Sequence, residues 1–203
     1  MNNKFITFEG GEGAGKSTQI RELENYLKSK GEKVVVTREP GGTIGSEEIR
    51  TILKTGDIDK FSRETELFLF YAARKDLSEK LIRPYLNKGY WVLCDRYADS
   101  TKVYQGYAGQ LDLEHINKVH EIANIEEPDI TFVFQISYED SLKRMKNRGD
   151  AEDRMESLGE DFHRRVSEGY NLLAESDKKR YIKIDAMQHK GDITNELIKH
   201  LNI

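Results

Sequence analysis

The chain has 203 residues, of which 33% are charged, and its formal net charge is −4. This length suits one domain with a sizeable core over residues 1–203, and the slightly acidic balance argues against nucleic acid as a partner. A single cysteine, Cys94, excludes a disulfide framework and a cysteine-based metal site. Residues 1–5 lack a signal-peptide core and no apolar stretch reaches the ~20 residues of a membrane span, so we expect a cytoplasmic protein without a membrane partner.

Five short runs rich in β-branched and aromatic residues predict strands, at 5–8, 33–37, 90–94, 130–136 and 181–184. Helical patterns lie between and after them, at 18–30, 46–54, 64–87, 113–124, 137–147, 160–176 and 192–201. We expect Ser62 to cap the long helix and Pro84 to kink it. Alternating strands and helices predict an α/β fold with a five-stranded parallel sheet between two helical layers. In such sheets ligands bind beyond the carboxyl ends of the strands.

Residues 10–17 read Gly-Gly-Glu-Gly-Ala-Gly-Lys-Ser, a complete G-x-x-x-x-G-K-S phosphate-binding loop between the first predicted strand and a helix. Loop N–H groups and the helix N-terminus form a nest for anionic oxygens. Lys16 can reach the β- and γ-phosphates, and the Ser17 hydroxyl can ligate Mg²⁺. The sequence therefore predicts a nucleoside triphosphate site. Its residues are Gly10, Gly11, Glu12, Gly13, Ala14, Gly15, Lys16, Ser17 and Thr18.

Polar side chains follow the second and third predicted strands, at the edge where a ligand is expected. Arg38 and Glu39 follow the second strand, and Asp95 and Arg96 follow the third. An aspartate that ends an apolar strand is typical of the carboxylate that orders Mg²⁺ beside a phosphate loop. Arg96 is either a ligand of a phosphate group or a structural partner of Asp95.

The long predicted helix carries Phe70 and Arg74, which are four residues apart and so lie on one face. Together with Arg38 and Arg96, Arg74 is a candidate to bind phosphate oxygens or base carbonyls through its planar guanidinium. A purely structural role stays open for Arg74 and for Phe70. Arg74 can be one charge on a solvated face, and Phe70 can belong to the core.

Two other classes of nucleotide-dependent protein find no support in the sequence. A GTPase needs an Asn-Lys-x-Asp guanine reader, but residues 87–90 and 117–120 both lack its aspartate. A protein kinase needs a His-Arg-Asp loop and an Asp-Phe-Gly segment, which do not occur. A small kinase that acts on a small acceptor remains.

Five motifs in this order resemble the thymidylate kinase family, and the resemblance covers nearly the whole chain. They are Phe-Glu-Gly-Gly-Glu-Gly-Ala-Gly-Lys-Ser-Thr at 8–18, Thr-Arg-Glu-Pro-Gly-Gly at 37–42, Leu-Phe-Tyr-Ala-Ala-Arg at 69–74, Asp-Arg-Tyr at 95–97 and Tyr-Gln-Gly-Tyr at 104–107. The resemblance implies a P-loop NTPase sandwich that transfers the γ-phosphate of ATP to dTMP with Mg²⁺, giving dTDP for dTTP biosynthesis. It also implies a homodimer.

The resemblance also implies a role for each matching residue. On the ATP side, Lys16 and the loop amides hold phosphates, and Ser17 ligates Mg²⁺ with Asp95. The implied dTMP contacts run from phosphate to base. They are Arg38 and Arg96 on the phosphate, Glu12 at the 3′-hydroxyl, Tyr104 against C2′, Phe70 stacked on thymine, Arg74 on a thymine carbonyl, and Gln105 with Ser100 or Thr101 on the other base edge.

Residues 145–156 are dense in charge and interrupted by glycine, which is typical of a flap. Some family members place an arginine in the phosphate loop, where this chain has Gly13, and the others supply the basic residue from the flap. By that resemblance we expect Arg148 or Arg154 to meet transition-state charge. The alternative of a solvated charge run stays open.

A phosphate-monoester acceptor has its second pKa near ~6, so at pH 7 it is itself the nucleophile and needs no general base. The nearest rival function is a deoxynucleoside kinase, in which Glu39 takes a proton from the acceptor hydroxyl. Three converging arginines serve little purpose around an uncharged nucleoside. A binding module that holds ATP without turnover is the other rival, and it has no use for an acceptor site.

Overall fold

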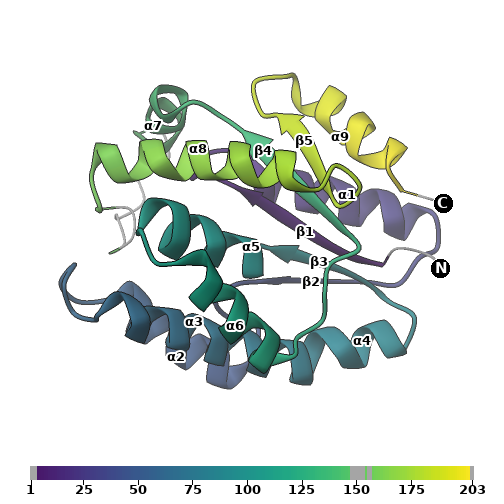
Figure 1. Cartoon of the computed structure of the whole chain (residues 1–203). Coiled ribbons are helices and arrows are strands. Elements are labelled where there is room, and N and C mark those ends of the chain that lie inside the picture. Colours follow the sequence, from purple (N-terminus) through teal and green to yellow (C-terminus); the bar gives the residue numbers. More distant parts are fainter. Residues whose placement is uncertain (1–3, 147–153, 155–156, 202–203) are drawn as a thin grey trace.

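The computed structural model describes residues 4–146, 154 and 157–201. Their centre is one parallel sheet of five strands in the order β2-β3-β1-β4-β5 (Figure 1). The strands are β1 (Phe5–Gly10), β2 (Val34–Arg38), β3 (Trp91–Asp95), β4 (Ile130–Gln135) and β5 (Tyr181–Asp185). Each coincides with a predicted strand to within two residues, and the predicted fold class is confirmed.

The pairing of the strands places the carboxyl ends of β1, β2 and β3 side by side at one edge of the sheet. Phe8 of β1 and Arg38 of β2 both pair with Asp95 of β3, on its two sides. On the other side of β1, Gly10 pairs with Phe134 of β4. The phosphate loop therefore leaves the sheet beside the ends of β2 and β3, as the parallel arrangement requires.

Helices cover both faces of the sheet and complete three layers (Figure 1). They are α1 (Lys16–Ser29), α2 (Ile44–Lys54), α3 (Arg63–Leu77), α4 (Arg83–Asn87), α5 (Ala98–Thr101), α6 (Leu113–Ala123), α7 (Tyr138–Lys146), α8 (Glu160–Ser176) and α9 (Lys190–Lys199), with π-helical η1 (Ser78–Ile82) and η2 (Lys102–Ala108). As predicted, Ser62 caps α3, with its side chain accepting the Thr65 N–H at 3.2 Å.

One expectation about the helices is refined and another needs correction. The chain is helical without a break over the predicted 64–87, but a π-helical segment at Ser78–Ile82 separates α3 from α4, and Pro84 lies at the start of α4. No helix was predicted over 98–108, where the chain forms α5 and η2. That segment lacks the 3.6-residue apolar period because it lines the ligand cleft on one side and packs against α8 on the other.

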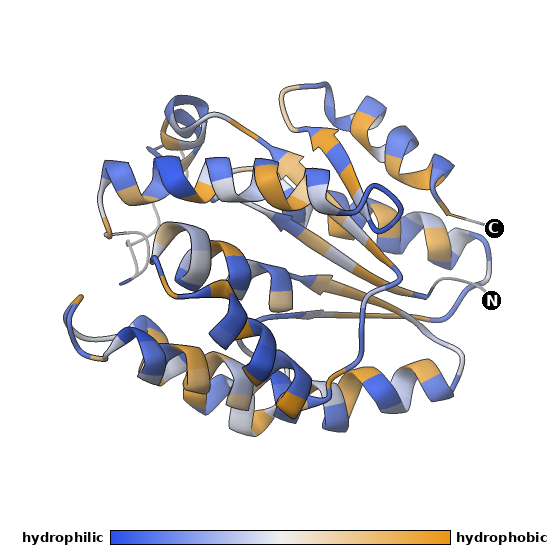
Figure 2. Ribbon diagram, viewed as in Figure 1, coloured by the Kyte–Doolittle hydropathy of each residue, from blue (hydrophilic) through white to orange (hydrophobic). Residues whose placement is uncertain are grey.

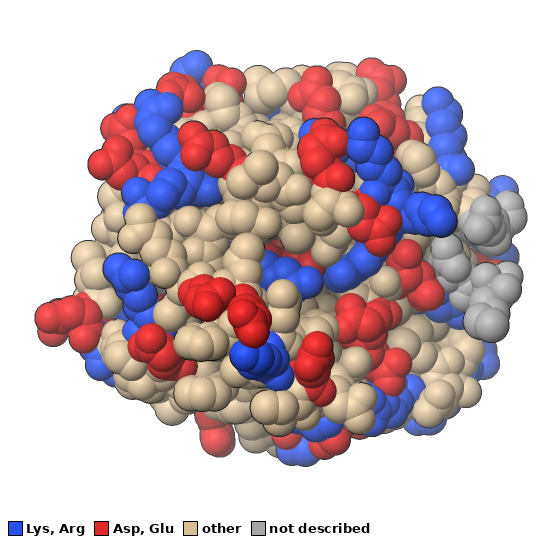
Figure 3. All heavy atoms as spheres, in the orientation of Figure 1, with Lys and Arg blue, Asp and Glu red and all other residues tan. Residues whose placement is uncertain are grey.

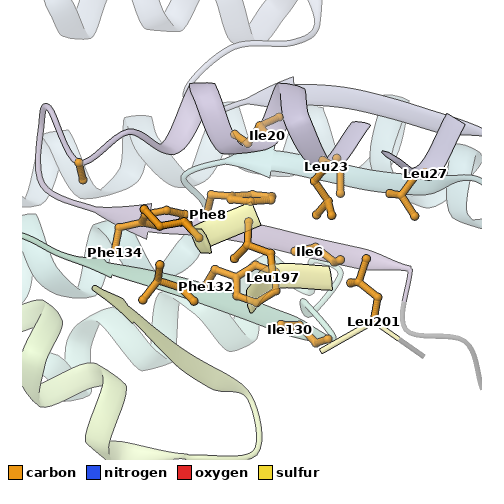
Figure 4. Close-up of a cluster of buried hydrophobic side chains, with 14 of the residues drawn as sticks. Ile6, Phe8, Ile20, Leu23, Leu27, Ile130, Phe132, Phe134, Leu197 and Leu201 are labelled. Atoms are coloured by element: carbon orange, nitrogen blue, oxygen red, sulfur yellow. The ribbon is translucent and has the colours of Figure 1, made fainter. Parts of the chain in front are cut away.

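The apolar core fills the space between the sheet and α1 and α9 (Figure 4). Phe8 and Phe132 point from neighbouring strands toward Leu23 and Leu197, and all four side chains are fully buried. Figure 2 shows the strands and the inward helix faces as the apolar part of the ribbon. Two smaller clusters lie on the other face of the sheet, under α3 and α6 and under α8.

Charged side chains of both signs are interspersed over the face shown in Figure 3. This mixture accords with a net charge close to zero for 32 basic and 36 acidic residues. Within the residues that the structure describes, no helix has the length and apolar content needed to cross a bilayer.

Candidate active site

The phosphate loop joins β1 to α1 at the edge of the sheet where β2 and β3 also end. Gly10 has φ 138°, and a Cβ there would stand 2.6 Å from the carbonyl oxygen of Phe134. The loop backbone thus packs against β4 at a distance that only glycine allows. The buried Lys16 ammonium donates to the carbonyl oxygens of Gly10 and Gly11, at 3.0 and 2.9 Å. It is held within the loop, where a phosphate would be cradled.

Ser17 and Asp95 form the site that the sequence assigns to Mg²⁺. The Ser17 hydroxyl donates to Asp95 Oδ2 at 2.8 Å. Two oxygen groups therefore meet between the first turn of α1 and the end of β3, and oxygen ligands of this kind suit Mg²⁺, which usually keeps waters and takes substrate phosphates as further ligands. The donor set fits the ion.

A cleft opens beside the loop and collects most of the predicted site. The predicted residues that line it are Glu12, Gly13, Ala14, Gly15, Lys16, Ser17, Arg38, Phe70, Arg74, Asp95, Arg96, Ser100, Thr101, Tyr104 and Gln105. Three predicted loop residues do not line this cleft. Gly10 and Gly11 give carbonyl oxygens to Lys16, and Thr18 lies half-buried in α1.

Arg96 is fixed by polar partners on several sides. Its Nη2 donates to Glu12 Oε1 at 2.5 Å, and its Nη1 donates to Tyr170 Oη at 3.0 Å and to Ser100 Oγ at 3.3 Å. Its guanidinium also lies over the Tyr104 ring, 5.1 Å from the centroid. Arg96 thus pairs with Glu12, rather than with Asp95 as the structural alternative held.

Opposing charge keeps Glu12 ionised. Burial alone would raise the pKa of its carboxyl, but the Arg96 guanidinium and the Lys16 ammonium hold that pKa at about 2. A full negative charge therefore lies beside Arg96 in the cleft.

Arg74 is buried to 1% exposure, which excludes the solvated helix face as its location. Its Nε donates to Glu39 Oε2 at 2.7 Å, and its Nη2 donates to the Tyr97 carbonyl and the Thr101 hydroxyl. Two buried polar atoms of this pair, Arg74 Nη1 and Glu39 Oε1, have no hydrogen-bond partner among the described residues. Buried polar groups are costly to leave unpaired, so these atoms mark a place where a ligand can bind.

Arg38 lies at the cleft mouth and is more exposed than the other two arginines. Its Nη2 donates to both carboxylate oxygens of Glu47, at 3.0 and 3.2 Å. Glu47 Oε1 also accepts the Gly42 N–H at 2.8 Å, so one side chain joins α2 to the loop after β2. Phe70 is only half-buried and lines the cleft, which favours the base-stacking expectation over the core alternative.

Arg154 lies beside the end of α2 and does not line the cleft, so its expected role at the phosphates stays a prediction. Its guanidinium forms an ion pair with Glu66 at 2.5 Å and donates to the carbonyl oxygens of Leu53 and Ile58. Those acceptors at the end of α2 satisfy a buried guanidinium. The second flap candidate, Arg148, lies outside the described residues.

Several cleft residues were missed from the sequence. Arg50 and Lys54 reach the cleft from α2, where basic residues read as an ordinary solvated face. Glu9 is completely buried at the end of β1, and accepts hydrogen bonds from Ser100 and Tyr170. A charged residue in an otherwise apolar strand was the available signal for Glu9. Burial and the nearby Asp99 raise the pKa of Glu9, whereas Arg96 lowers it.

A phosphate loop on a five-stranded parallel sheet, facing a cleft lined with arginines, defines a P-loop kinase of small phosphorylated acceptors. The thymidylate kinase family model matches residues 8–197, and the chain belongs to that family. It is 48% identical to the thymidylate kinase of Caulobacter vibrioides over 183 residues, covering 90% of this chain and 88% of the relative. It is 42% identical to that of Dinoroseobacter shibae, covering 98% and 97%. A crystal structure of thymidylate kinase from Ehrlichia chaffeensis superposes with a TM-score of 0.78 at 31% identity, covering 98% of both chains.

The buried carboxyl of Glu39 generates a pH-dependent prediction. Burial raises its pKa from 4.5 to about 7, although Arg74 opposes the shift. Between these values the folded protein binds more protons than the unfolded chain, so this group's contribution to stability is lost as the pH rises through about 7. Relative to Glu39→Gln, the free energy of unfolding of the wild type should fall by up to about 3 kcal/mol between pH 4.5 and 8. Urea unfolding at several pH values measures this difference.

The exposed Glu121 provides the matched control for this measurement. Stability of Glu121→Gln should run parallel to the wild type over the same pH range. A wild-type curve parallel to that of Glu39→Gln would show that Glu39 does not titrate in this window.

Proposed function

We propose that this single-domain kinase transfers the γ-phosphoryl group of ATP to dTMP and so produces dTDP for dTTP biosynthesis. The observation that carries this function is the match of the thymidylate kinase family over residues 8–197 to a chain whose cleft joins the phosphate loop to a group of arginines that includes Arg38, Arg74 and Arg96. The phosphate loop provides the donor side and the strand ends provide the acceptor side. ATP and dTMP are metabolites of the cytoplasm, where we place the enzyme.

On the donor side, the ATP phosphates lie in the nest formed by the loop from Gly10 to Thr18. Lys16 then exchanges its carbonyl partners for phosphate oxygens, which are stronger acceptors for an ammonium group. Ser17 and Asp95 would hold Mg²⁺, whose positive charge would offset that of the phosphates.

On the acceptor side, the dTMP phosphate binds Arg96 and Arg38, and Glu12 contacts the 3′-hydroxyl. The support is geometric, because Arg96 donates to Glu12 within the loop and Arg38 lines the same cleft. An incoming phosphate competes with Glu12 and Glu47 for the guanidinium groups. A dianion is the stronger competitor, since it offers more charge and more acceptor oxygens.

The base lies deeper in the cleft, on the residues that carry unpaired polar atoms. Arg74 Nη1, which has no partner among the described residues, donates to a thymine carbonyl, and Phe70 stacks on the ring. Gln105 with Ser100 or Thr101 reads the other base edge. The Tyr104 ring fills the space beside C2′, where a ribose hydroxyl would collide. Specificity for a deoxynucleotide follows from this steric exclusion.

The residues work by positioning and charge neutralisation rather than by proton transfer. The acceptor oxygen of dTMP is already anionic at pH 7, and the barrier lies in bringing two anions together. Lys16, Arg38 and Arg96 meet that charge, and we propose that a flap arginine, Arg148 or Arg154, completes it. For Arg154 this requires release of the Glu66 ion pair when ATP binds.

The rival function, a deoxynucleoside kinase with Glu39 as general base, is disfavoured. The Glu39 carboxylate accepts a hydrogen bond from Arg74 Nε at 2.7 Å. Because Arg74 is assigned to the thymine base, Glu39 belongs to the base pocket and not to the place where an acceptor hydroxyl would lie. Family membership points to the phosphorylated acceptor as well.

Product formation with Mg·ATP tests the function directly. Reactions with dTMP, thymidine, dUMP, UMP and dCMP are separated by chromatography. We expect dTDP from dTMP at a rate far above that of thymidine, UMP and dCMP, because thymidine lacks the phosphate, UMP carries the ribose 2′-hydroxyl, and dCMP has an amino group in place of a base carbonyl. Product from thymidine alone would restore the deoxynucleoside kinase, and ATP binding without any product would leave only an ATP-binding module.

We also propose that the enzyme is a homodimer. Apolar side chains are exposed on α3 and on the two helices that pack against it, α2 and α6. Ile44, Phe68 and Ile122 are 84%, 60% and 83% exposed, more than expected for a face that remains in water. A second copy of the chain would cover these side chains.

Phe68→Glu tests the dimer. A carboxylate in an apolar interface is costly to desolvate, so the variant should elute as a monomer when light scattering measures its mass. Leu172→Glu on α8 is the matched control, because Leu172 is 57% exposed on another helix, and it should remain dimeric. A Phe68→Glu protein with the mass of the wild type would reject this face as the interface.

A further inference from the structure

Glu9 is a buried charged group that the transfer reaction itself leaves without a role. It is 0% exposed and pairs with Val133 of β4 in the sheet, directly before the phosphate loop. Glu9 does not itself line the cleft, and its carboxylate lies behind the lining, against the backbone of Tyr97 and Ser100. A buried carboxylate at this place needs a physical explanation, because burial of a charge is costly unless it is fully hydrogen-bonded.

Four donors surround the carboxylate, two at each oxygen. Oε1 accepts the backbone N–H groups of Tyr97 at 2.7 Å and of Ser100 at 3.2 Å. Oε2 accepts the hydroxyl groups of Ser100 at 2.6 Å and of Tyr170 at 2.9 Å. The pKa of Glu9 is raised by burial and by Asp99, and hydrogen bonds from this donor shell oppose that rise.

The two hydroxyl groups connect Glu9 to Arg96. An ionised carboxylate only accepts, so the Ser100 and Tyr170 hydroxyls must donate to it. Their lone pairs are then available to Arg96 Nη1, which donates to both oxygens at 3.3 and 3.0 Å. Glu9 thereby orients two acceptors that hold the arginine from behind.

The backbone of Arg96 needs the same support. Its φ is 66°, a left-handed conformation that costs free energy in a residue with a long side chain. The Arg96 N–H donates to the Phe8 carbonyl at 3.0 Å, and the next N–H, that of Tyr97, donates to Glu9. Two adjacent residues of β1 therefore hold the turn in the conformation that presents the Arg96 guanidinium to the cleft.

We propose that Glu9 is a positioning residue that sets the affinity of the enzyme for the acceptor phosphate by fixing the conformation of Arg96. The proposal rests on the role of Arg96 in binding the dTMP phosphate. Glu9 contacts neither substrate. It restrains Arg96 through the turn and through the two hydroxyls, so that the phosphate meets an arginine that is already in place.

Glu9→Gln preserves the shape of the side chain and removes this restraint. If the amide oxygen faces the backbone N–H groups, the amide NH₂ takes the place of Oε2 and cannot accept from Ser100 or Tyr170. If the amide is flipped, its NH₂ opposes two N–H donors. Either orientation breaks part of the shell and releases Arg96.

Titration calorimetry of the full-length enzyme with dTMP, thymidine and ATP separately provides the test. Glu9→Gln should weaken dTMP binding roughly 10- to 100-fold, the range for one hydrogen bond to a charged group. Thymidine lacks the phosphate and ATP binds the other side, so both affinities should change less than about threefold. On an Arg96→Ala background, Glu9→Gln should cause little further loss of dTMP affinity, because the group it positions is absent.

The outcomes separate the two proposals. If Arg96→Ala binds dTMP as the wild type does, the acceptor role of Arg96 is wrong, and the role of Glu9 falls with it. If Arg96→Ala weakens dTMP but Glu9→Gln does not, Glu9 has no positioning role. Equal losses for all three ligands, or an undiminished loss on the Arg96→Ala background, would show a general structural role instead.

Thermal unfolding first establishes that each variant is folded. Should Glu9→Gln not fold, Tyr170→Phe replaces it, since it keeps the buried ring and deletes one of the two hydroxyls between Glu9 and Arg96. The same selective loss of dTMP affinity is expected, smaller than for Glu9→Gln. Unchanged dTMP affinity in Tyr170→Phe would then overturn the proposal.

Discussion

Convergence of positive charge at one edge of the sheet is the constraint on which the rest of the site depends. An enzyme that joins two anions must gather cations, and cations held close together repel one another in the empty protein. The chain resolves this with carboxylates. Three of the cleft arginines each have a glutamate partner, in the pairs Arg96–Glu12, Arg74–Glu39 and Arg38–Glu47.

The three pairs differ in burial, and the difference suits their proposed tasks. The Arg74–Glu39 pair is almost completely buried, so it provides a fixed wall for the uncharged base. The Arg38–Glu47 pair is largely exposed and is therefore the weakest, which lets an arriving phosphate displace the glutamate. Arg96 stands between these extremes, held from behind by hydroxyls and in front by Glu12. Substrate binding is then an exchange of one anion for another, with little new desolvation of the arginines.

Local signals in the sequence were enough to predict the sheet, the phosphate loop and the strand-end polar residues. Apolar strands, a complete glycine-lysine-serine motif and parallel topology together place these groups at one edge. Glu9 and Tyr170 were beyond this reasoning, because they meet across 161 residues of sequence and Tyr170 reads as a core position of α8. The ion pair of Arg154 with Glu66 was unforeseen for a similar reason, since Glu66 lies on α3, far away in the sequence. A contact between side chains that are far apart in the sequence produces no periodic pattern from which a single sequence could predict it.

A crystal structure of the enzyme with dTMP alone tests the central claim most directly, that the arginine cleft is the acceptor site. The account predicts the dTMP phosphate on Arg96 and Arg38, and a thymine carbonyl on Arg74 Nη1. It also predicts that Arg96 keeps its contacts with Tyr170 and Ser100 while Glu12 yields to the phosphate. A dTMP phosphate seated instead in the loop at Lys16, or a base that leaves Arg74 Nη1 unpaired, would contradict the account.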